Sequence, residues 1–300
     1  MEIEKCPICN SKQLSFFLMK NDCDFSKCRD CGLVFMNPQP TVEGLVNDFL
    51  TEKCGYHSKL NKDLTKIKKH RNFFVGIIDK LIKMGARGNL LDVGCSNGEL
   101  MFLAKENGFD VYGVEVNKDT AKIAVNNGLN VFLGTLQEAN FQSDYFSVIC
   151  LMGVVEDIPD IPPLLKECHR ILKKGGTIVI STPNLDCFWA RATEKLNKWF
   201  KFPWSVIIPY YRLFVFSDSN LRNLLLKLRF KIKKIDYPLF PLKHELAATG
   251  LFAKFKKKKS IGALSYMISV FSAYSLVYFI NFLSRPILNK DFKMVFFAEK

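Results

Sequence analysis

Two carboxylates, Asp92 and Glu115, stand at the ends of apolar segments, and a loop of small residues lies between them in the chain. The loop reads DVGCSNG from Asp92; its glycines, Gly94 and Gly98, permit a sharp turn and let a ligand approach without an intervening Cβ. A helix-like pattern follows, and its free N–H groups would point at the same space. If both apolar segments are parallel strands, the carboxylates meet at the sheet edge where open α/β sheets bind ligands.

The ligand that fits this pair of carboxylates is a cationic nucleoside. Three residues separate Gly94 from Gly98, so the loop departs from the G-x-G-x-x-G pattern of dinucleotide-binding loops. A pyrophosphate beside Asp92 would also be repelled. S-adenosylmethionine carries an ammonium and a sulfonium, has a ribose and lacks phosphate. We therefore expect Asp92 near its cationic end and Glu115 on its ribose hydroxyls.

Four cysteines near the N-terminus form two C-x-x-C pairs, Cys6 with Cys9 and Cys28 with Cys31. This spacing brings paired sulfurs to one side of a tight turn, and two such turns complete a thiolate tetrahedron for Zn²⁺. A segment of about forty residues buries too little surface to fold unaided, so the metal would supply much of its stability. We also expect a cytoplasmic, reducing compartment, because the chain does not start with an export signal.

The elements that must position these residues alternate in type along the chain. Short apolar runs separated by helix-like spacing predict parallel strands joined by helices. The expected strands cover 89–93, 110–115, 130–133, 148–151 and 177–182, and an antiparallel-looking run closes the chain at 293–300.

Taken together, these segments resemble the class I S-adenosylmethionine-dependent methyltransferases. The resemblance lies in LLDVGCSNGELM with GVE, in LLKECHRILKKGGTIVISTPN and in the final KMVFFAEK. It implies a Rossmann-like α/β fold with a seven-stranded, mostly parallel sheet whose last strand is antiparallel. The N-terminal CPIC and CRDCGLVFMNPQP resemble the zinc-binding head, a small zinc ribbon, of a subgroup often linked to sugar, lipopolysaccharide or other secondary biosynthesis.

The same resemblance implies which residues contact the cofactor. They are Asp92, Gly94, Cys95, Gly98, Glu115, Thr135, Leu136 and Met152, with Thr135 and Leu136 bordering the adenine. The chain departs from the subgroup at 152–157, which reads MGVVED where a pattern like WHVLEH is expected. Both histidine positions differ, so Glu156 and Asp157 are the remaining candidates for a catalytic base. The alternative interpretation is that they are acidic residues favoured at a helix start.

The expected domain organisation has three parts. A zinc ribbon covers 1–40, a helical connector covers 41–74, and the methyltransferase domain covers 75–300 with an apolar helical insertion at about 255–285.

The insertion contains an uncharged segment, 261–283, that is long enough to cross a bilayer and follows the lysine-rich run 254–259. A spanning helix would separate the final strand from the sheet, so an interfacial helix on an anionic membrane surface fits better. A buried lid or a homodimer helix is the alternative.

The net charge of +14 favours an anionic partner, such as a nucleic acid or an acidic membrane surface. The predicted function is methyl transfer from S-adenosylmethionine to a small-molecule or lipid-linked acceptor, such as a sugar intermediate, in the cytoplasm or at the inner face of the membrane. An RNA methyltransferase is a second hypothesis, favoured by the charge and the zinc head. A catalytically lapsed, membrane-recruited binding module is a third.

Overall fold

The computed structural model describes most of the chain. The described residues are 2–20, 22–40, 62–66, 71–204, 206–207, 212–239, 242, 246, 261–288 and 290–300. Most of the predicted connector at 41–74 and all of the lysine-rich run at 254–259 lie outside them.

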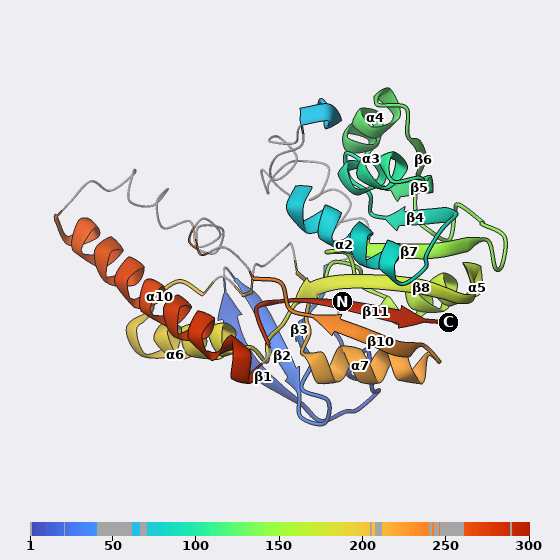
Figure 1. Cartoon of the computed structure of the whole chain (residues 1–300). Coiled ribbons are helices and arrows are strands. Elements are labelled where there is room, and N and C mark those ends of the chain that lie inside the picture. Colours follow the sequence, from blue (N-terminus) through green and yellow to red (C-terminus); the bar gives the residue numbers. More distant parts are fainter. Residues whose placement is uncertain are drawn as a thin grey trace.

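A seven-stranded sheet forms the centre of the molecule, in the order β10-β11-β8-β7-β4-β5-β6 (Figure 1). Its strands are β4 (Asn89–Val93), β5 (Asp110–Glu115), β6 (Asn130–Leu133), β7 (Phe146–Met152), β8 (Leu172–Pro183), β10 (Lys231–Asp236) and β11 (Lys293–Glu299). The strands from β8 to β6 are parallel, whereas β11 runs antiparallel to both β8 and β10. The predicted α/β fold with an antiparallel last strand is confirmed.

Helices cover both faces of this sheet, and successive side chains along each strand point to opposite faces. In β7 and β8, Cys150 and Val179 face a core built with α2, whereas Ile149 and Ile180 face a second core. Burial on both faces explains why these strands are almost continuously apolar in sequence. The helices are α2 (Arg71–Lys83), α3 (Glu99–Glu106), α4 (Lys118–Asn126), α5 (Ile161–Ile171), α6 (Phe188–Phe200), α7 (Asp218–Lys227) and α10 (Ile261–Leu288), with a short 3₁₀ turn η2 (Leu64–Lys66).

The N-terminal segment forms a second, four-stranded sheet in the order β1-β2-β3-β9. Its strands are β1 (Leu14–Lys20), β2 (Cys23–Cys28), β3 (Val34–Met36) and β9 (Phe214–Val215). The last of these comes from the part of the chain predicted to form the methyltransferase domain, and Val34 and Phe35 pair with Val215 and Phe214. Buried residues of the N-terminal head share one core with the seven-stranded sheet.

Helix α10 lies in the chain between the last two strands and packs beside α6, on the side of the molecule away from α3 and α4 (Figure 1). After α10 the chain returns to the sheet, where Lys293 pairs with Pro183 at the carboxyl end of β8. By length and composition, Gly262–Ser284 is apolar enough to cross a bilayer, with a mean hydropathy of 1.6. This criterion identifies a candidate span and does not show membrane association.

Candidate functional site

The loop after β4 turns on two glycines with left-handed backbone. Gly94 has φ of 69° and Gly98 has φ of 85°. A Cβ on Gly94 would lie 2.8 Å from Val154 Cγ2, and one on Gly98 would lie 2.4 Å from Leu129 Cδ1. Both positions therefore require glycine for conformation and for space, because the loop packs against Val154 after β7 and Leu129 before β6.

Glu115 is buried at the carboxyl end of β5, and the backbone orients its carboxylate. Ser96 N donates to one oxygen at 2.7 Å, and Asn117 N donates to the other at 2.8 Å. A carboxylate can accept several hydrogen bonds at its two oxygens. The arrangement suits recognition of two adjacent hydroxyls by a preoriented acceptor.

Asp92 lies in β4 beside this loop, and its side chain is 3% exposed. Its Oδ1 is buried and has no hydrogen-bond partner in the described part of the chain. Burial raises the pKa of Asp92 well above its usual range, and the negative charge of Glu115 adds to the rise. A cationic ligand would supply the compensation that this carboxylate lacks.

The other residues predicted to contact the cofactor border the same edge of the sheet. Cys95 is buried, and its Sγ would lie 2.7 Å from a Cβ on Gly113, so the side chain packs the loop onto β5. Thr135 follows β6 and hydrogen-bonds to Glu138, whereas Leu136 is buried. Met152 is half-buried at the end of β7. Their contact with a cofactor remains a prediction.

The two acidic candidates for catalysis follow β7 and lie in a buried polar cluster. Glu156 is buried, and the backbone N–H groups of Leu213 and Phe214 donate to its carbonyl oxygen. Burial raises the pKa of Glu156, and the positive charges of Arg212 and Lys293 oppose that rise. Asp157 is half-buried, and its pKa is raised by burial and by the charge of Glu156.

Lys293 is the residue of this cluster that was not predicted from the sequence. It begins β11, which enters the sheet at the edge where β7 and β8 end. Burial lowers the pKa of Lys293 to about 8, and Glu156 opposes the change. Its Nζ lies 3.7 Å from the centre of the Phe73 ring. The sequence signal that could have identified Lys293 is a lysine at the start of the final apolar run. An antiparallel last strand starts at the edge of the sheet where the parallel strands end.

Buried hydroxyls extend the cluster along β8. Ser181 Oγ and Thr182 Oγ1, together with Glu156 Oε2 and Asp157 Oδ1, find no hydrogen-bond partner among the residues that the structure describes. Buried polar atoms are almost always paired, so a concentration of unpaired ones indicates a place that receives a polar ligand.

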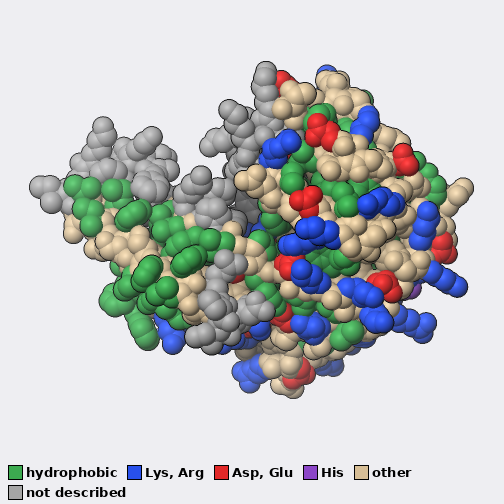
Figure 2. Space-filling model, in the orientation of Figure 1, with side chains coloured by type: hydrophobic (Ala, Val, Ile, Leu, Met, Phe, Trp, Pro, Cys, Tyr) green, Lys and Arg blue, Asp and Glu red, His purple; other side chains and the backbone are tan. Residues whose placement is uncertain are grey.

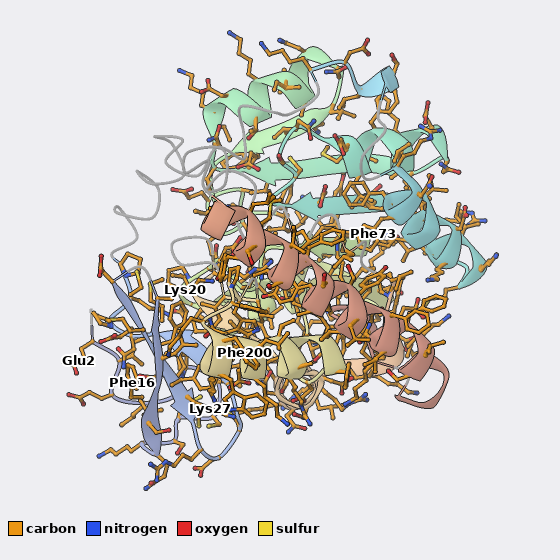
Figure 3. All side chains as sticks on the ribbon, turned by 90° about the vertical axis from the view of Figure 1, so that its left-hand side faces the viewer. Glu2, Phe16, Lys20, Lys27, Phe73 and Phe200 are labelled. Atoms are coloured by element: carbon orange, nitrogen blue, oxygen red, sulfur yellow. The ribbon has the colours of Figure 1, made fainter. Side chains whose placement is uncertain are left out.

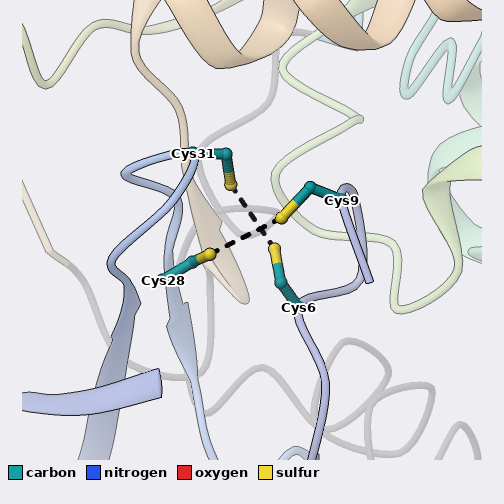
Figure 4. Close-up of side chains that lie close together, drawn as sticks. All are labelled: Cys6, Cys9, Cys28 and Cys31. Carbon is teal, nitrogen blue, oxygen red and sulfur yellow. Dashed lines mark hydrogen bonds between the residues drawn. The ribbon is translucent and has the colours of Figure 1, made fainter. Parts of the chain in front are cut away.

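The four predicted metal ligands converge at the end of the N-terminal sheet where β2 finishes with Cys28 (Figure 4). Cys6 Sγ lies 3.5 Å from Cys31 Sγ, Cys9 Sγ lies 3.6 Å from Cys28 Sγ, and all four sulfurs are within 4.8 Å of one another. Tetrahedral Zn²⁺ with bonds of about 2.3 Å requires sulfurs about 3.8 Å apart. The donor set therefore fits a closed site for a soft dication.

The turns that carry these cysteines have matching geometry. Asn10 N donates to Cys6 O at 2.9 Å, and Gly32 N donates to Cys28 O at 3.0 Å. A hydrogen bond with Cys31 lowers the pKa of Cys6 to about 5, while the pKa of Cys31 is raised. A bound dication would stabilise all four thiolates in place of such shared protons.

Comparison with known proteins assigns the family. A family model described as a methyltransferase domain matches residues 66–234, more than half of the chain. The chain belongs to the methyltransferase family. With the strand order of the central sheet, this confirms the predicted membership of the class I S-adenosylmethionine-dependent methyltransferases.

Individual relatives match parts of this methyltransferase. A ubiquinone biosynthesis O-methyltransferase of Idiomarina loihiensis is 33% identical over 104 residues, which cover 32% of this chain and 42% of that protein. An uncharacterized protein of Methanocaldococcus jannaschii is 27% identical over 125 residues, covering 42% of this chain and 59% of that protein. The chain thus spans about half the length of the curated relatives it matches.

A solved structure shares the fold. Phosphoethanolamine N-methyltransferase 2 of Haemonchus contortus, in complex with S-adenosyl-L-methionine, gives a TM-score of 0.54 at 13% identity. The match covers 95% of this chain and 71% of that chain. At this identity the likeness concerns the fold alone.

Proposed function

We propose that this methyltransferase transfers a methyl group from S-adenosylmethionine to a hydroxyl of a small-molecule or lipid-linked acceptor. The observation that carries the proposal is the buried, uncompensated Asp92 beside the preoriented Glu115. Among the described residues Asp92 lacks a compensating positive charge, and Glu115 presents acceptor oxygens. Both lie at the sheet edge where open α/β folds bind their ligands.

Each carboxylate has its own part in binding. The charge of Asp92 attracts the cationic methionine end of the cofactor, and Glu115 accepts hydrogen bonds from the ribose hydroxyls. The cofactor supplies an activated methyl group on its sulfonium. The loop at Gly94 and Gly98 and the strand ends hold it in position, which is itself a large part of catalysis in an in-line displacement.

The acceptor would lie against the buried polar cluster after β7 and β8. The acceptor oxygen forms a bond to the methyl carbon, the sulfonium becomes a thioether, and the hydroxyl proton must leave. We assign Asp157 as the group that receives this proton, because its Oδ1 has no hydrogen-bond partner among the described residues and burial raises its pKa, whereas Arg212 and Lys293 oppose the corresponding rise for Glu156. An O-methyltransferase among the relatives supports oxygen as the methylated atom.

The four-cysteine site has a structural part in this proposal. Cys6, Cys9, Cys28 and Cys31 would bind Zn²⁺ through four thiolates, a complete coordination shell that leaves no position for a substrate.

Calorimetric titration of S-adenosylmethionine and S-adenosylhomocysteine into the zinc-loaded protein tests the cofactor site. We expect micromolar binding that Glu115→Ala abolishes, while Glu106→Ala, an exposed acidic control at the end of α3, retains it. Failure of folded wild-type protein to bind either compound would refute the proposal and favour a non-catalytic module. A screen of hydroxyl compounds and RNA then identifies the acceptor, and Asp157→Asn tests the proton transfer by lowering kcat without weakening cofactor binding.

A further inference from the structure

Helix α10 has one buried stripe, which fastens it to the body of the protein. Val270, Tyr274 and Asn281 are buried along it. The Tyr274 ring packs on Trp189 of α6 with centroids 5.4 Å apart, and its hydroxyl donates to Pro203 O. These contacts hold the helix along the surface of the molecule.

The opposite side of α10 is apolar and open to solvent. Leu276 is 59% exposed and Phe279 is 57% exposed, and Ile268 and Phe271 are exposed on the same helix. No charged residue occurs between Gly262 and Phe282. Figure 2 shows hydrophobic side chains gathered over α10 and α6, whereas the rest of that face mixes them with charged groups. An exposed apolar area of this kind indicates an interaction surface.

The end of α6 extends this surface and carries basic residues. Trp199 is 71% exposed and Phe200 is also exposed. Lys195, Lys198 and Lys201 are exposed on and just after the same helix. Figure 3 views this side, with Phe200 at the end of α6 that lies toward β1. Aromatic side chains bordered by lysines are typical of proteins that sit in the headgroup region of a bilayer.

We propose that the exposed side of α10, together with Trp199 and Phe200, docks this methyltransferase on the surface of an anionic lipid bilayer. We call this surface the apolar face. The helix would lie in the plane of the interface, with its apolar side chains among the acyl chains and the lysines on the headgroups.

The positive charges around the apolar face favour a bilayer, and not a second copy of the chain, as its binding partner. The lysines of α6 border the apolar face, and the sequence places Lys256 to Lys259 directly before α10, outside the described residues. A symmetric dimer through this face would bring the basic residues of both copies together in a protein of net charge +14, which opposes association. An anionic membrane surface is complementary to them.

The carboxyl-terminal part of α10 links the apolar face to the catalytic edge of the sheet. Asn281 Nδ2 donates to Asp291 Oδ1 at 3.2 Å, and Asn184 Nδ2 donates to Asp291 O at 3.2 Å. Asn184 directly follows β8, and Asp291 is separated only by Phe292 from Lys293, the first residue of β11. Docking would therefore bring this edge toward the membrane, where a lipid-linked acceptor resides. This last step rests on the proposed function, whereas docking itself does not.

The fluorescence emission of Trp199 can be used to measure docking on a membrane. The other two tryptophans, Trp189 and Trp204, are each 2% exposed, so a change in emission on membrane contact reports on the apolar face. We expect a shift of emission to shorter wavelength, and co-sedimentation, with vesicles of equal parts phosphatidylcholine and phosphatidylglycerol. Vesicles of phosphatidylcholine alone should bind much more weakly, and added salt should weaken binding to the anionic vesicles.

Matched variants separate this surface from general charge. The double variant Leu276→Glu, Phe279→Glu should bind anionic vesicles at least about tenfold more weakly. The control variant Val125→Glu, Leu226→Glu places the same added charge at exposed apolar positions on α4 and α7 and should bind like the wild type. Titration of S-adenosylmethionine and circular dichroism check that each variant is folded.

Two results would overturn the proposal: no binding of the wild type to anionic vesicles at low salt, or equal binding by the double variant. A concentration-dependent dimer that the double variant abolishes, without vesicle binding, would assign the face to a second copy instead. Absence of cofactor binding would refute the methyltransferase proposal and leave the vesicle result unchanged, so the two failures are distinguishable.

Discussion

Asp92, which we propose binds the cationic end of the cofactor, destabilises the ligand-free protein at neutral pH. Its folded-state pKa lies above the value of about 3.9 for an unfolded chain, so the native state retains a proton that the unfolded state has lost. The free energy of unfolding therefore falls as the pH rises from that value toward the native pKa. A cationic ligand would reverse this loss by pairing with the carboxylate.

The first prediction follows from this linkage. Asp92→Asn should raise the melting temperature of the ligand-free protein at neutral pH, by about 2–4 °C for each kcal/mol gained. It should also weaken S-adenosylmethionine binding by about 10–150-fold, because a charge-assisted hydrogen bond is lost. Thermal unfolding across pH 4 to 8 and calorimetry measure both effects. A variant less stable than the wild type, with unchanged affinity, would contradict the prediction.

Lys293 gives a second prediction, in which the free energy of unfolding rises with pH instead of falling. Its pKa of about 8 lies below the value of about 10.4 for an unfolded chain. The unfolded state thus binds more protons between these values, and the free energy of unfolding should rise with pH by up to about 3 kcal/mol. Lys293→Met should remove this rise, whereas Lys231→Met, at an exposed position of β10, should retain it. Denaturant unfolding at several pH values provides the test, and an unchanged slope in Lys293→Met would refute it.

The sequence predicted the placement of Asp92 and Glu115 because each residue ends a strand whose direction follows from local pattern. It did not predict that Lys293 lies close enough for its charge to interact with Glu156, because this depends on which strand lies next to which. The pairing of β11 with β8 joins strands that are far apart in the chain.

At the scale of elements, the strands that hold the cofactor loop were predicted accurately. Buried apolar runs bounded by glycine and polar residues gave 89–93 and 110–115, which are the observed bounds of β4 and β5. The expected strand at 177–182 was too short, since β8 begins at Leu172, directly after α5. Gly175 and Gly176 hydrogen-bond with Lys300 at the other end of the chain, a contact that local pattern does not reveal.

The glycine loop gives a third prediction with an internal control. Gly98→Ala places a Cβ 2.4 Å from Leu129 Cδ1 in a backbone of φ 85°, whereas Gly128→Ala meets no atom within 4 Å at a φ of 72°. Both substitutions carry the strain of left-handed backbone, about 1–2 kcal/mol. In Gly98→Ala, overpacking should lower the free energy of unfolding by roughly a further 1–3 kcal/mol. This substitution should also weaken cofactor binding. Urea unfolding compares the two, and equal losses would show that the contact with Leu129 relaxes freely.

At the scale of the whole molecule, the N-terminal head that carries the four-cysteine cluster is integrated with the seven-stranded sheet. The sequence predicted a zinc ribbon at 1–40 from its two pairs of cysteines, and the structure brings these cysteines together. The pattern did not show that β3 pairs with β9, because a strand of two residues such as Phe214–Val215 carries no periodic signal. Phe214 of β9 and the preceding Leu213 also donate to the carbonyl oxygen of Glu156, so β9 joins the head to the polar cluster of the candidate site.

This integration gives the fourth prediction, which concerns the loss of metal. A separate head would unfold alone when its zinc is removed, whereas a head that shares a core and a sheet with the catalytic domain should destabilise all of it. We expect a chelator, or Cys9→Ser at an exposed ligand, to lower the melting temperature of one cooperative transition and to weaken cofactor binding. Cys23→Ser, a buried cysteine of β2 outside the four-cysteine cluster, controls for loss of a thiol. Calorimetry that resolved a separate transition for the head, with the catalytic transition unmoved, would show that β3 and β9 do not couple them.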